Sequence, residues 1–203
     1  MLGTPKRNRI SERREAVRAE ILEAAWATAR EAGIGGVTLA EVARRVGMQP
    51  PSLYTHVDSK HALYDLMFGQ AWRACVDSMP DPTDLPEPPR ERLRAIARWF
   101  FDFSVADAAR FALMNQQVIP DFTPSAEAYA PSQECWAALV ALMADLGVRD
   151  PADLDLYAVI VGGLVDSQLA NDPGGDRYAR LLDRAIDMFA DEVGLAGARG
   201  DAR

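Results

Sequence analysis

The chain has 203 residues, of which 49% are hydrophobic and 26% charged, a composition typical of a soluble globular protein with a full core. The sequence holds no apolar run of about 18 residues, which argues against a membrane span, and its basic N-terminus lacks the apolar stretch of a secretory signal. The net charge of −8 argues against a whole surface made for nucleic acid, but the first 60 residues hold 10 Lys and Arg against 7 Asp and Glu. We therefore expect a cytoplasmic protein with a basic N-terminal part for DNA and an acidic remainder.

The first predicted helix ends near Gly33 and has Ser11 as its candidate N-cap. Residues 1–10 show no apolar periodicity and are expected to be mobile. One helical face is apolar: Val17, Ile21, Ala24, Ala25 and Thr28. A basic arm lies at the N-terminal edge of this helix and contains Lys6, Arg7, Arg9, Arg13 and Arg14. This arm either adds phosphate or minor-groove contacts or is a solvated tail, and the sequence leaves both readings open.

Residues 38–60 have the pattern of a helix, a tight turn and a second, very short helix. Thr38 and Glu41 have the spacing of a capping box, and Gly47 can end the first helix in a left-handed conformation. The Pro-Pro pair at 50–51 suits the first turn of the next helix. Polar side chains are then expected to face outward: Gln49, Ser52, Tyr54, Thr55 and His56. This pattern favours a DNA-reading helix-turn-helix over an ordinary helical hairpin in an all-α core.

The same segment matches a known family pattern at Thr38, Ala43, Val46, Gly47, Met48, Ser52, Leu53, Tyr54, Thr55, His56, Val57, Ser59, Lys60, His61, Ala62 and Leu63. It resembles the N-terminal domain of TetR-family transcriptional regulators, specifically over roughly residues 10–65. Two features depart from that pattern: the Pro-Pro pair, where Lys-Gly or similar is common, and Val57, where Phe is usual. The resemblance implies an all-α fold: a three-helix DNA-binding helix-turn-helix domain (1–59), joined by a long helix to a helical ligand-binding and dimerisation domain (60–203).

Two sets of DNA contacts are expected from this segment. Facing the major groove should be Gln49, Pro50, Ser52, Tyr54, Thr55 and His56, and the expected phosphate anchors are Thr38, Arg44, Tyr54 and Lys60. Lys60 stands at the N-terminus of a long helix predicted to run to Met79, where backbone N–H groups and the helix dipole favour an anion. The alternative for Arg44 is an ordinary place on a solvated helix face.

Beyond a proline-rich loop at 80–89, helices are predicted at 90–105, 107–118, 125–146, 150–170 and 176–193. Their aromatic, Met and amide side chains either line a ligand cavity or form plain core, and the family resemblance implies a cavity. The pocket candidates are Phe68, Trp72, Trp99, Phe103, Phe111, Met114, Asn115, Gln117 and Trp136.

The predicted helix at 150–170 is apolar nearly all round, so both of its sides should be buried. Gly162 and Gly163 inside it cost about 1 kcal/mol each relative to Ala, which the close approach of another backbone could offset. A four-helix interface with a second copy about a two-fold axis would provide that burial, and burial within one chain is the alternative. The interface candidates are Val159, Gly162, Gly163, Asp166, Leu182, Ala185 and Phe189.

The motifs of common enzymes are missing: the sequence has no phosphate-binding glycine loop, no His-Glu-x-x-His and no nucleophile elbow. We therefore expect no enzyme activity and no cofactor. A metal site is also not expected, because His56, His61 and Asp58 lack a fourth ligand. Cys75 and Cys135 are read as buried thiols in a reducing compartment, with redox sensing as the lesser alternative.

The sequence thus predicts a homodimeric regulator that binds double-stranded operator DNA. It should act as a repressor that a small apolar or amphipathic effector releases from the operator. The alternative is a ligand-binding helical dimer without specific operator recognition. Neither the effector nor the operator can be named from the sequence.

Overall fold

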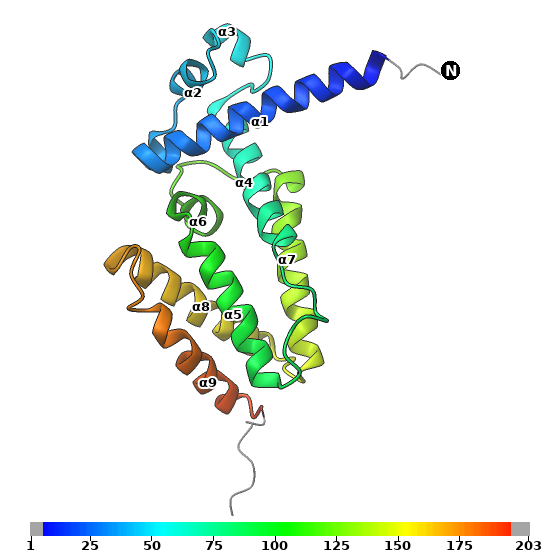
Figure 1. Ribbon diagram of the computed structural model, residues 1–203, viewed down its shortest axis with the longest axis vertical. Coiled ribbons are helices and arrows are strands. Elements are labelled where there is room, and N and C mark those ends of the chain that lie inside the picture. Colours follow the sequence, from blue (N-terminus) through cyan, green and yellow to red (C-terminus); the bar gives the residue numbers. More distant parts are fainter. Residues whose placement is uncertain (1–5, 196–203) are drawn as a thin grey trace, which may run out of the picture. The chain divides into compact units, whose positions relative to one another are not determined.

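The structure, a computed structural model, describes residues 6–195, and of residues 6–10 the backbone alone. The regular structure of this part of the chain is entirely helical, which confirms the predicted all-α class. None of these helices is long and apolar enough to cross a bilayer. The elements are α1 (Lys6–Ala32), η1 (Ile34–Gly36), α2 (Leu39–Arg45), α3 (Pro50–Leu53), α4 (Lys60–Asp77), α5 (Pro89–Val105), α6 (Ala108–Asn115), α7 (Ala126–Asp145), α8 (Pro151–Asn171), η2 (Ala179–Leu181) and α9 (Leu182–Glu192), where η marks a short 3-10 helix (Figure 1).

The start of the first helix was predicted wrongly. Helix α1 begins at Lys6, so Ser11 lies inside the helix and does not cap it. The Ser11 hydroxyl donates instead to the carboxylate of Glu15, one turn later, at 3.1 Å. Residues 1–5 and the side chains of Lys6, Arg7 and Arg9 lie outside the described part of the chain, so the basic arm is visible only at Arg13 and Arg14, which are exposed.

The last helix also begins later than predicted, at Leu182 rather than near residue 176. The buried amide of Gln168 on α8 organises the intervening chain. Its Oε1 accepts hydrogen bonds from the backbone N–H groups of Tyr178 at 2.9 Å and Ala179 at 3.2 Å. A buried amide whose acceptor binds two backbone donors fixes a turn where the sequence pattern alone suggested a continuous helix.

The chain forms two compact units, each described here by itself. The first, called the head unit, comprises Met1–Trp72 and Ala109–Ala130, and the second, called the body unit, comprises Arg73–Ala108 and Pro131–Arg203. Helices α4, α6 and α7 each contribute to both units. Compactness therefore groups the helix-turn-helix with a later segment of the chain. The predicted boundary after residue 59 divides the chain by role, and it stays a prediction.

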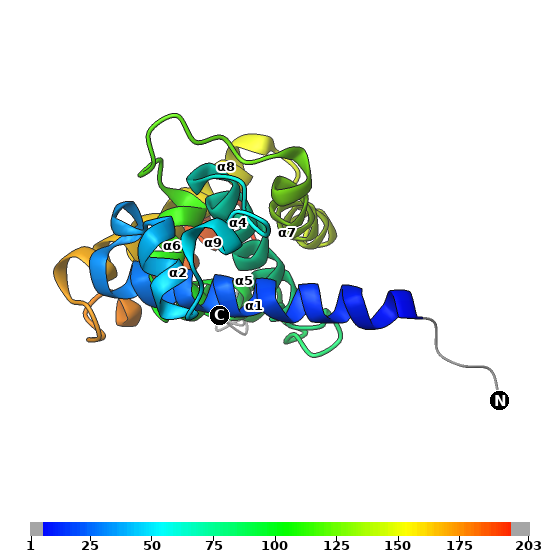
Figure 2. The same ribbon diagram turned by 90° about the horizontal axis from the view of Figure 1, so that it is seen from above.

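In the head unit, α2 and η1 pack against α1 (Figures 1 and 2). Side-chain hydrogen bonds fasten α4 to the same framework. The Tyr64 hydroxyl donates to the carbonyl oxygen of Ile34 at 2.8 Å, and the Trp26 indole N–H donates to Gln70 Oε1 at 2.7 Å. Tyr64 and Ile34 are buried, so the bond between them satisfies polar groups that water cannot reach.

The body unit is built on α5, α8 and α9, which pack against one another. The Tyr157 ring meets the Phe189 ring edge-on, with centroids 5.5 Å apart, and the Tyr157 hydroxyl donates to the carbonyl oxygen of Leu93 at 3.0 Å. Burial raises the pKa of Tyr157 because the phenolate would lose its hydration. Tyr157 therefore joins the three helices as a neutral hydrogen-bond donor.

Three arginines of α5 pair with three aspartates of α9, and we call this set the arginine–aspartate ladder. Its pairs are Arg90 with Asp191, Arg94 with Asp187 at 2.8 Å, and Arg98 with Asp183 at 3.1 Å. Each step of four residues forward along α5 is matched by a step of four residues back along α9, as two antiparallel helices require.

Candidate functional site

The predicted capping box of α2 is half formed. The Glu41 backbone N–H donates to Thr38 Oγ1 at 3.2 Å, as predicted. The Glu41 carboxylate does not return to the Thr38 backbone but accepts from the guanidinium groups of Arg44 and Arg45, each through Nε at 2.8 Å. Arg45 also binds Glu31 of α1, with 3.0 Å between Nη1 and Oε1. These four charged side chains, called the Glu41 network, fasten α2 to α1.

The turn after α2 follows the sequence prediction. Gly47 has a φ of 68°, a conformation that costs a residue without Cβ little. The Met48 backbone N–H donates to the carbonyl oxygen of Ala43 at 2.9 Å, which satisfies an otherwise unpaired carbonyl at the helix end. Helix α3 then begins at Pro50, and its one buried residue, Leu53, is wholly inaccessible.

The outer face of α3 and the residues that flank it are largely polar and accessible. Exposed residues there are Gln49, Pro50, Ser52, Tyr54 and Thr55, with 51% of the Tyr54 surface accessible. His56 is only half-buried, yet its Nδ1 is enclosed and has no hydrogen-bond partner among the described residues. Five of the six predicted base-facing residues therefore lie on one accessible segment.

The predicted phosphate anchors are all within reach of solvent. Thr38 is exposed, although its hydroxyl oxygen already accepts the cap hydrogen bond. The Arg44 side chain is exposed and paired with Glu41. Lys60 Nζ donates to the carbonyl oxygen of Gly35 at 3.1 Å and lies 5.4 Å from the centroid of the Tyr64 ring, which positions its charge at the start of α4.

The Glu41 network makes the stability of the head unit depend on pH in the acid range. Hydrogen bonds from Arg44 and Arg45 lower the pKa of Glu41 from 4.5 to about 2. A carboxylate with a lowered pKa stabilises the fold fully above its ordinary value, and we expect this contribution to fade as the pH falls through about 2. A carbon-detected NMR titration of the Glu41 carboxyl group should show a midpoint near 2, and Arg45→Gln should move it toward 4.5. Arg18→Gln, at an exposed site on α1, is the matched control, and an unshifted midpoint in Arg45→Gln would contradict the assignment.

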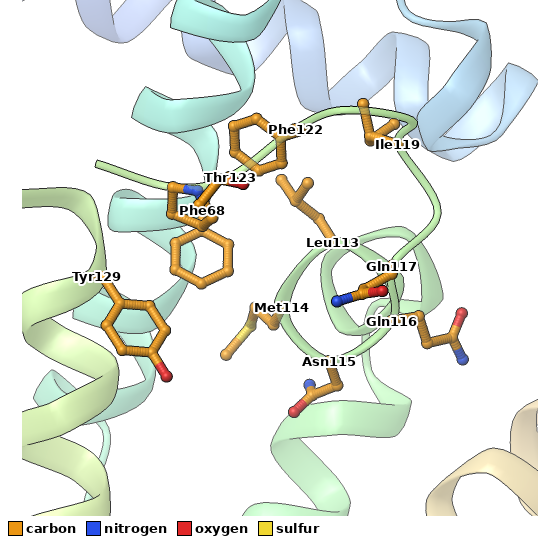
Figure 3. Close-up of a pocket in the computed structure, with 11 residues that line it drawn as sticks. Phe68, Leu113, Met114, Asn115, Gln116, Gln117, Ile119, Phe122, Thr123 and Tyr129 are labelled. Carbon is orange, nitrogen blue, oxygen red and sulfur yellow. The ribbon is translucent and has the colours of Figure 1, made fainter. Parts of the chain in front are cut away.

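A cavity of about 230 Å³ lies within the head unit, between α4, α6 and the start of α7 (Figure 3). It is lined by Phe68, Leu113, Met114, Asn115, Gln116, Gln117, Ile119, Phe122, Thr123, Pro124 and Tyr129. The Phe68 and Tyr129 rings stack with centroids 6.1 Å apart and 14° between their planes. These described lining residues include no carboxylate and no basic side chain, so the polar groups offered to a ligand are neutral amides and hydroxyls.

Four of the nine predicted pocket residues line this cavity: Phe68, Met114, Asn115 and Gln117. The other five do not. Phe111 is buried as core, and Trp72 meets the Phe68 ring with centroids 6.4 Å apart but is not part of the lining. Trp99, Phe103 and Trp136 belong to the body unit, where the Trp99 indole N–H donates to Ser78 Oγ at 3.2 Å.

Phe122 is the pocket residue that the sequence gave least reason to choose. It lies in the segment between α6 and α7, which has no helical periodicity and two prolines. Its ring contacts three residues on one face of α4, with centroid distances of 6.0 Å to His61, 5.8 Å to Tyr64 and 6.5 Å to Phe68. The pocket and the α4 attachment to η1 are therefore joined through one aromatic side chain.

The predicted interface residues divide into exposed, half-buried and buried sets, and Gly162 and Ala185 are half-buried. Exposed on α8 are Val159, at 69% of its surface, Gly163 and Asp166. Apart from the adjacent residues and the nearby backbone of α8 itself, no described heavy atom would lie within 4 Å of a Cβ at Gly162 or Gly163, so the backbone approach expected there does not come from another described element. Leu182 and Phe189 are corrected: both are buried inside the body unit and have no surface to offer a second copy.

Clusters of ionisable side chains do not form a metal site in the described part of the chain, where no three His, Cys, Asp or Glu residues are placed to hold an ion. The cavity and the helix-turn-helix are thus two features of the described head unit with a geometry suited to binding.

Comparison with known proteins agrees with this geometry. Residues 21–67 match the family model described as bacterial regulatory proteins, tetR family. HTH-type transcriptional regulators of Mycobacterium tuberculosis and Mycobacterium bovis are 27% identical over 119 residues, which are 56% of this chain and 51% of theirs. The match thus spans about half the length of these curated relatives.

Solved structures share the fold over most of the chain. The TetR family transcriptional regulator PfmR from Thermus thermophilus has a TM-score of 0.62 at 19% identity and covers 89% of this chain and 99% of its own. The transcriptional regulator FadR from Bacillus subtilis, solved with stearoyl-CoA, has a TM-score of 0.69 at 12% identity, with 89% and 99% covered. At such identities the likeness establishes the fold.

Proposed function

We propose, from the match of residues 21–67 to the family model of bacterial regulatory proteins, tetR family, that the protein is a cytoplasmic, homodimeric regulator that binds operator DNA and is released by a small uncharged ligand. The division of roles that we propose is DNA binding by residues 1–59 and ligand binding and dimerisation by residues 60–203. The observation that carries the proposal is the accessible polar face of α3, held by a buried Leu53 and a structured turn.

The DNA-reading role rests on what α3 and its flanks present. Hydrogen-bonding side chains at Ser52, Tyr54 and Thr55 suit contacts to base edges, whereas Arg44 and Lys60 suit phosphates. Base contacts discriminate between sequences, and phosphate contacts act on all sequences alike. A protein with both sets should bind one DNA site far more tightly than random DNA.

The test is binding of the full chain to DNA from upstream of its own gene, against scrambled DNA, across a salt series. We expect a preference of about a thousandfold or more at physiological salt. Equal affinities for both DNAs that fade together with salt would overturn specific reading of this DNA. That result would favour the rival function, a ligand-binding helical dimer without operator recognition.

The ligand-binding role rests on the chemistry of the head-unit cavity. Its aromatic and aliphatic walls favour an apolar body, and its amides favour a neutral polar group. The Gln117 amide points toward the cavity in Figure 3, whereas that of Gln116 points away. An anionic or cationic ligand would enter without an opposite charge among these lining residues, so we propose an uncharged effector.

Filling the cavity should weaken the binding of an uncharged aromatic probe. We expect Met114→Trp to weaken the binding of 2-naphthol by about tenfold or more, measured by fluorescence titration, because the indole occupies the space the probe needs. Arg18→Trp, at an exposed site on α1 outside the cavity lining, should leave probe binding unchanged. Equal affinity in wild type and Met114→Trp would place the probe elsewhere.

Coupling from ligand to DNA is proposed to pass through Phe122. A ligand beside Phe68 and Phe122 would press on α4, whose Tyr64 and Lys60 hold the carbonyl oxygens of η1 next to the helix-turn-helix. Release then requires that the ligand bind the DNA-incompetent arrangement more tightly, by a coupling of about 1–3 kcal/mol.

The homodimer is proposed to form through the outer face of α8. Val159 and Leu156 are exposed apolar residues there, and Leu181 and Met188 add exposed apolar surface from the η2–α9 segment. Val159→Asp should therefore convert the dimer to a monomer, because association would bury an unpaired carboxylate. Light scattering after size exclusion measures this, and Val118→Asp, at another exposed valine, should leave the mass unchanged. A dimeric Val159→Asp would show that the interface lies elsewhere.

A further inference from the structure

Two cysteine thiols contact each other where α7 lies against the last turns of α4. The Cys135 thiol is hydrogen-bonded to Cys75, and both residues belong to the body unit. Cys75 is wholly buried, whereas Cys135 is half-buried and reaches the surface. They are the two cysteines of the sequence, and both are present as thiols. One thiol of the pair is therefore buried, and the other is accessible from the surface.

An ion pair beside the cysteines links the two helices. Arg73, two residues before Cys75, pairs with Glu134, the residue before Cys135, at 2.9 Å. The Ser78 hydroxyl donates to the carbonyl oxygen of Cys75 at 2.9 Å and so ties down the end of α4. Contacts that do not involve sulfur therefore join the two helices on either side of the thiol pair. A disulfide requires two cysteine side chains that lie close together.

The two thiols also differ in reactivity. The hydrogen bond with Cys75 holds the pKa of Cys135 below its ordinary value, against the opposing effects of burial and of the Glu134 carboxylate. A thiolate, not a thiol, attacks peroxides. Cys135 is thus both the more accessible sulfur and the one whose anion is stabilised by its neighbour.

We propose that Cys75 and Cys135 form a peroxide-oxidised dithiol site, in which Cys135 attacks and Cys75 resolves. The Cys135 thiolate attacks one oxygen of hydrogen peroxide, the O–O bond breaks, and the departing hydroxide takes up a proton to become water. Cys135 is then a sulfenic acid. The Cys75 sulfur attacks the Cys135 sulfur, the S–O bond breaks, and the hydroxyl group leaves with the Cys75 proton as a second water. The protein is oxidised by two electrons, the peroxide is reduced, and an S–S bond joins α4 to α7.

The site is distinct from the cavity and from the helix-turn-helix, both of which lie in the head unit. It therefore does not depend on the proposed regulatory function. Its chemistry stands or falls on the two sulfurs alone.

The test is oxidation of the full-length reduced protein with hydrogen peroxide, followed by thiol titration and by mass spectrometry of a non-reducing digest. We expect the titrated thiols to fall from two per chain to none. The digest should contain a peptide pair joined through Cys75 and Cys135 that is lighter by two hydrogen atoms than the two free peptides. On a non-reducing gel the oxidised protein should run as a single chain, because the bond forms within one chain. Dithiothreitol should restore both thiols.

Single variants assign the roles of the two cysteines. Cys75→Ala should leave a lasting Cys135 sulfenic acid that dimedone traps, and Cys135→Ala should leave Cys75 unreacted at the same peroxide dose. An unchanged thiol count in wild type, a disulfide between separate chains, or equal dimedone labelling in both variants would overturn the proposal. The wild-type digest decides the bond itself even where a variant is too unstable to purify.

Discussion

Leu53→Ala should lower the free energy of unfolding by about 2–5 kcal/mol, the usual cost of removing a buried leucine side chain without collapse of the space. The cost should be felt in α3, because this helix has four residues and one buried anchor. A helix so short is not stable by itself and depends on the packing of that anchor. Specific DNA binding should be lost together with stability, as measured by gel shift and by urea unfolding followed by circular dichroism.

The neighbouring exposed residue provides the control for this change. Ser52→Ala should change the free energy of unfolding by no more than about 0.5 kcal/mol, while weakening the DNA complex if the Ser52 hydroxyl meets the DNA. If Leu53→Ala unfolded at the same urea concentration as Ser52→Ala, α3 would not depend on its anchor. A loss of stability in one variant and a loss of DNA binding alone in the other would distinguish the residue that anchors α3 from the residue that contacts DNA.

Phe189→Ala should be the most damaging single change in the body unit, at about 3–5 kcal/mol. The Phe189 ring is buried against the Tyr157 ring at 5.5 Å, and Tyr157 in turn binds the Leu93 carbonyl oxygen. Its removal would open a cavity at the meeting point of α5, α8 and α9. The measurement is urea unfolding followed by far-ultraviolet circular dichroism.

Arg184→Ala on the same helix is the matched control, because Arg184 is exposed. It should change the free energy of unfolding by about 0.5 kcal/mol or less. A loss for Phe189→Ala no larger than that of Arg184→Ala would mean that α9 contributes little to the core. Such a result would also argue against a place for Phe189 in the core of the body unit.

Local patterns predicted the cap, the turn and the second helix start of the helix-turn-helix well, because their signals lie within a few residues of one another. The cap at Thr38, the left-handed Gly47 and the proline start of α3 are each set by neighbours in sequence. Sequence neighbours did not determine which group the Glu41 carboxylate would bind. The Thr38 backbone and two arginines were all in reach, and the contact of Arg45 with Glu31 depends on how α1 and α2 pack.

The pocket and the interface show where periodicity stops being informative. Phe122 lies in an irregular segment, so no repeat marked it, although its ring contacts three residues of α4. Hydrophobic residues all round α8 predicted burial on both sides, but the pattern could not say whether the same chain provides it. The structure leaves Val159 exposed, so within the chain the burial is one-sided.

The spacing of the arginine–aspartate ladder also disfavours a shifted register of α9 on α5. Because its charges repeat every four residues on both helices, sliding α9 by one turn along α5 would still align two pairs but leave an arginine and an aspartate unmatched at the ends. A slip of two turns would leave one pair. Exposed ion pairs contribute little each, about 0–1 kcal/mol, yet mismatched arrangements lose them one at a time. The ladder thus favours the native alignment of α5 and α9 over a shifted one.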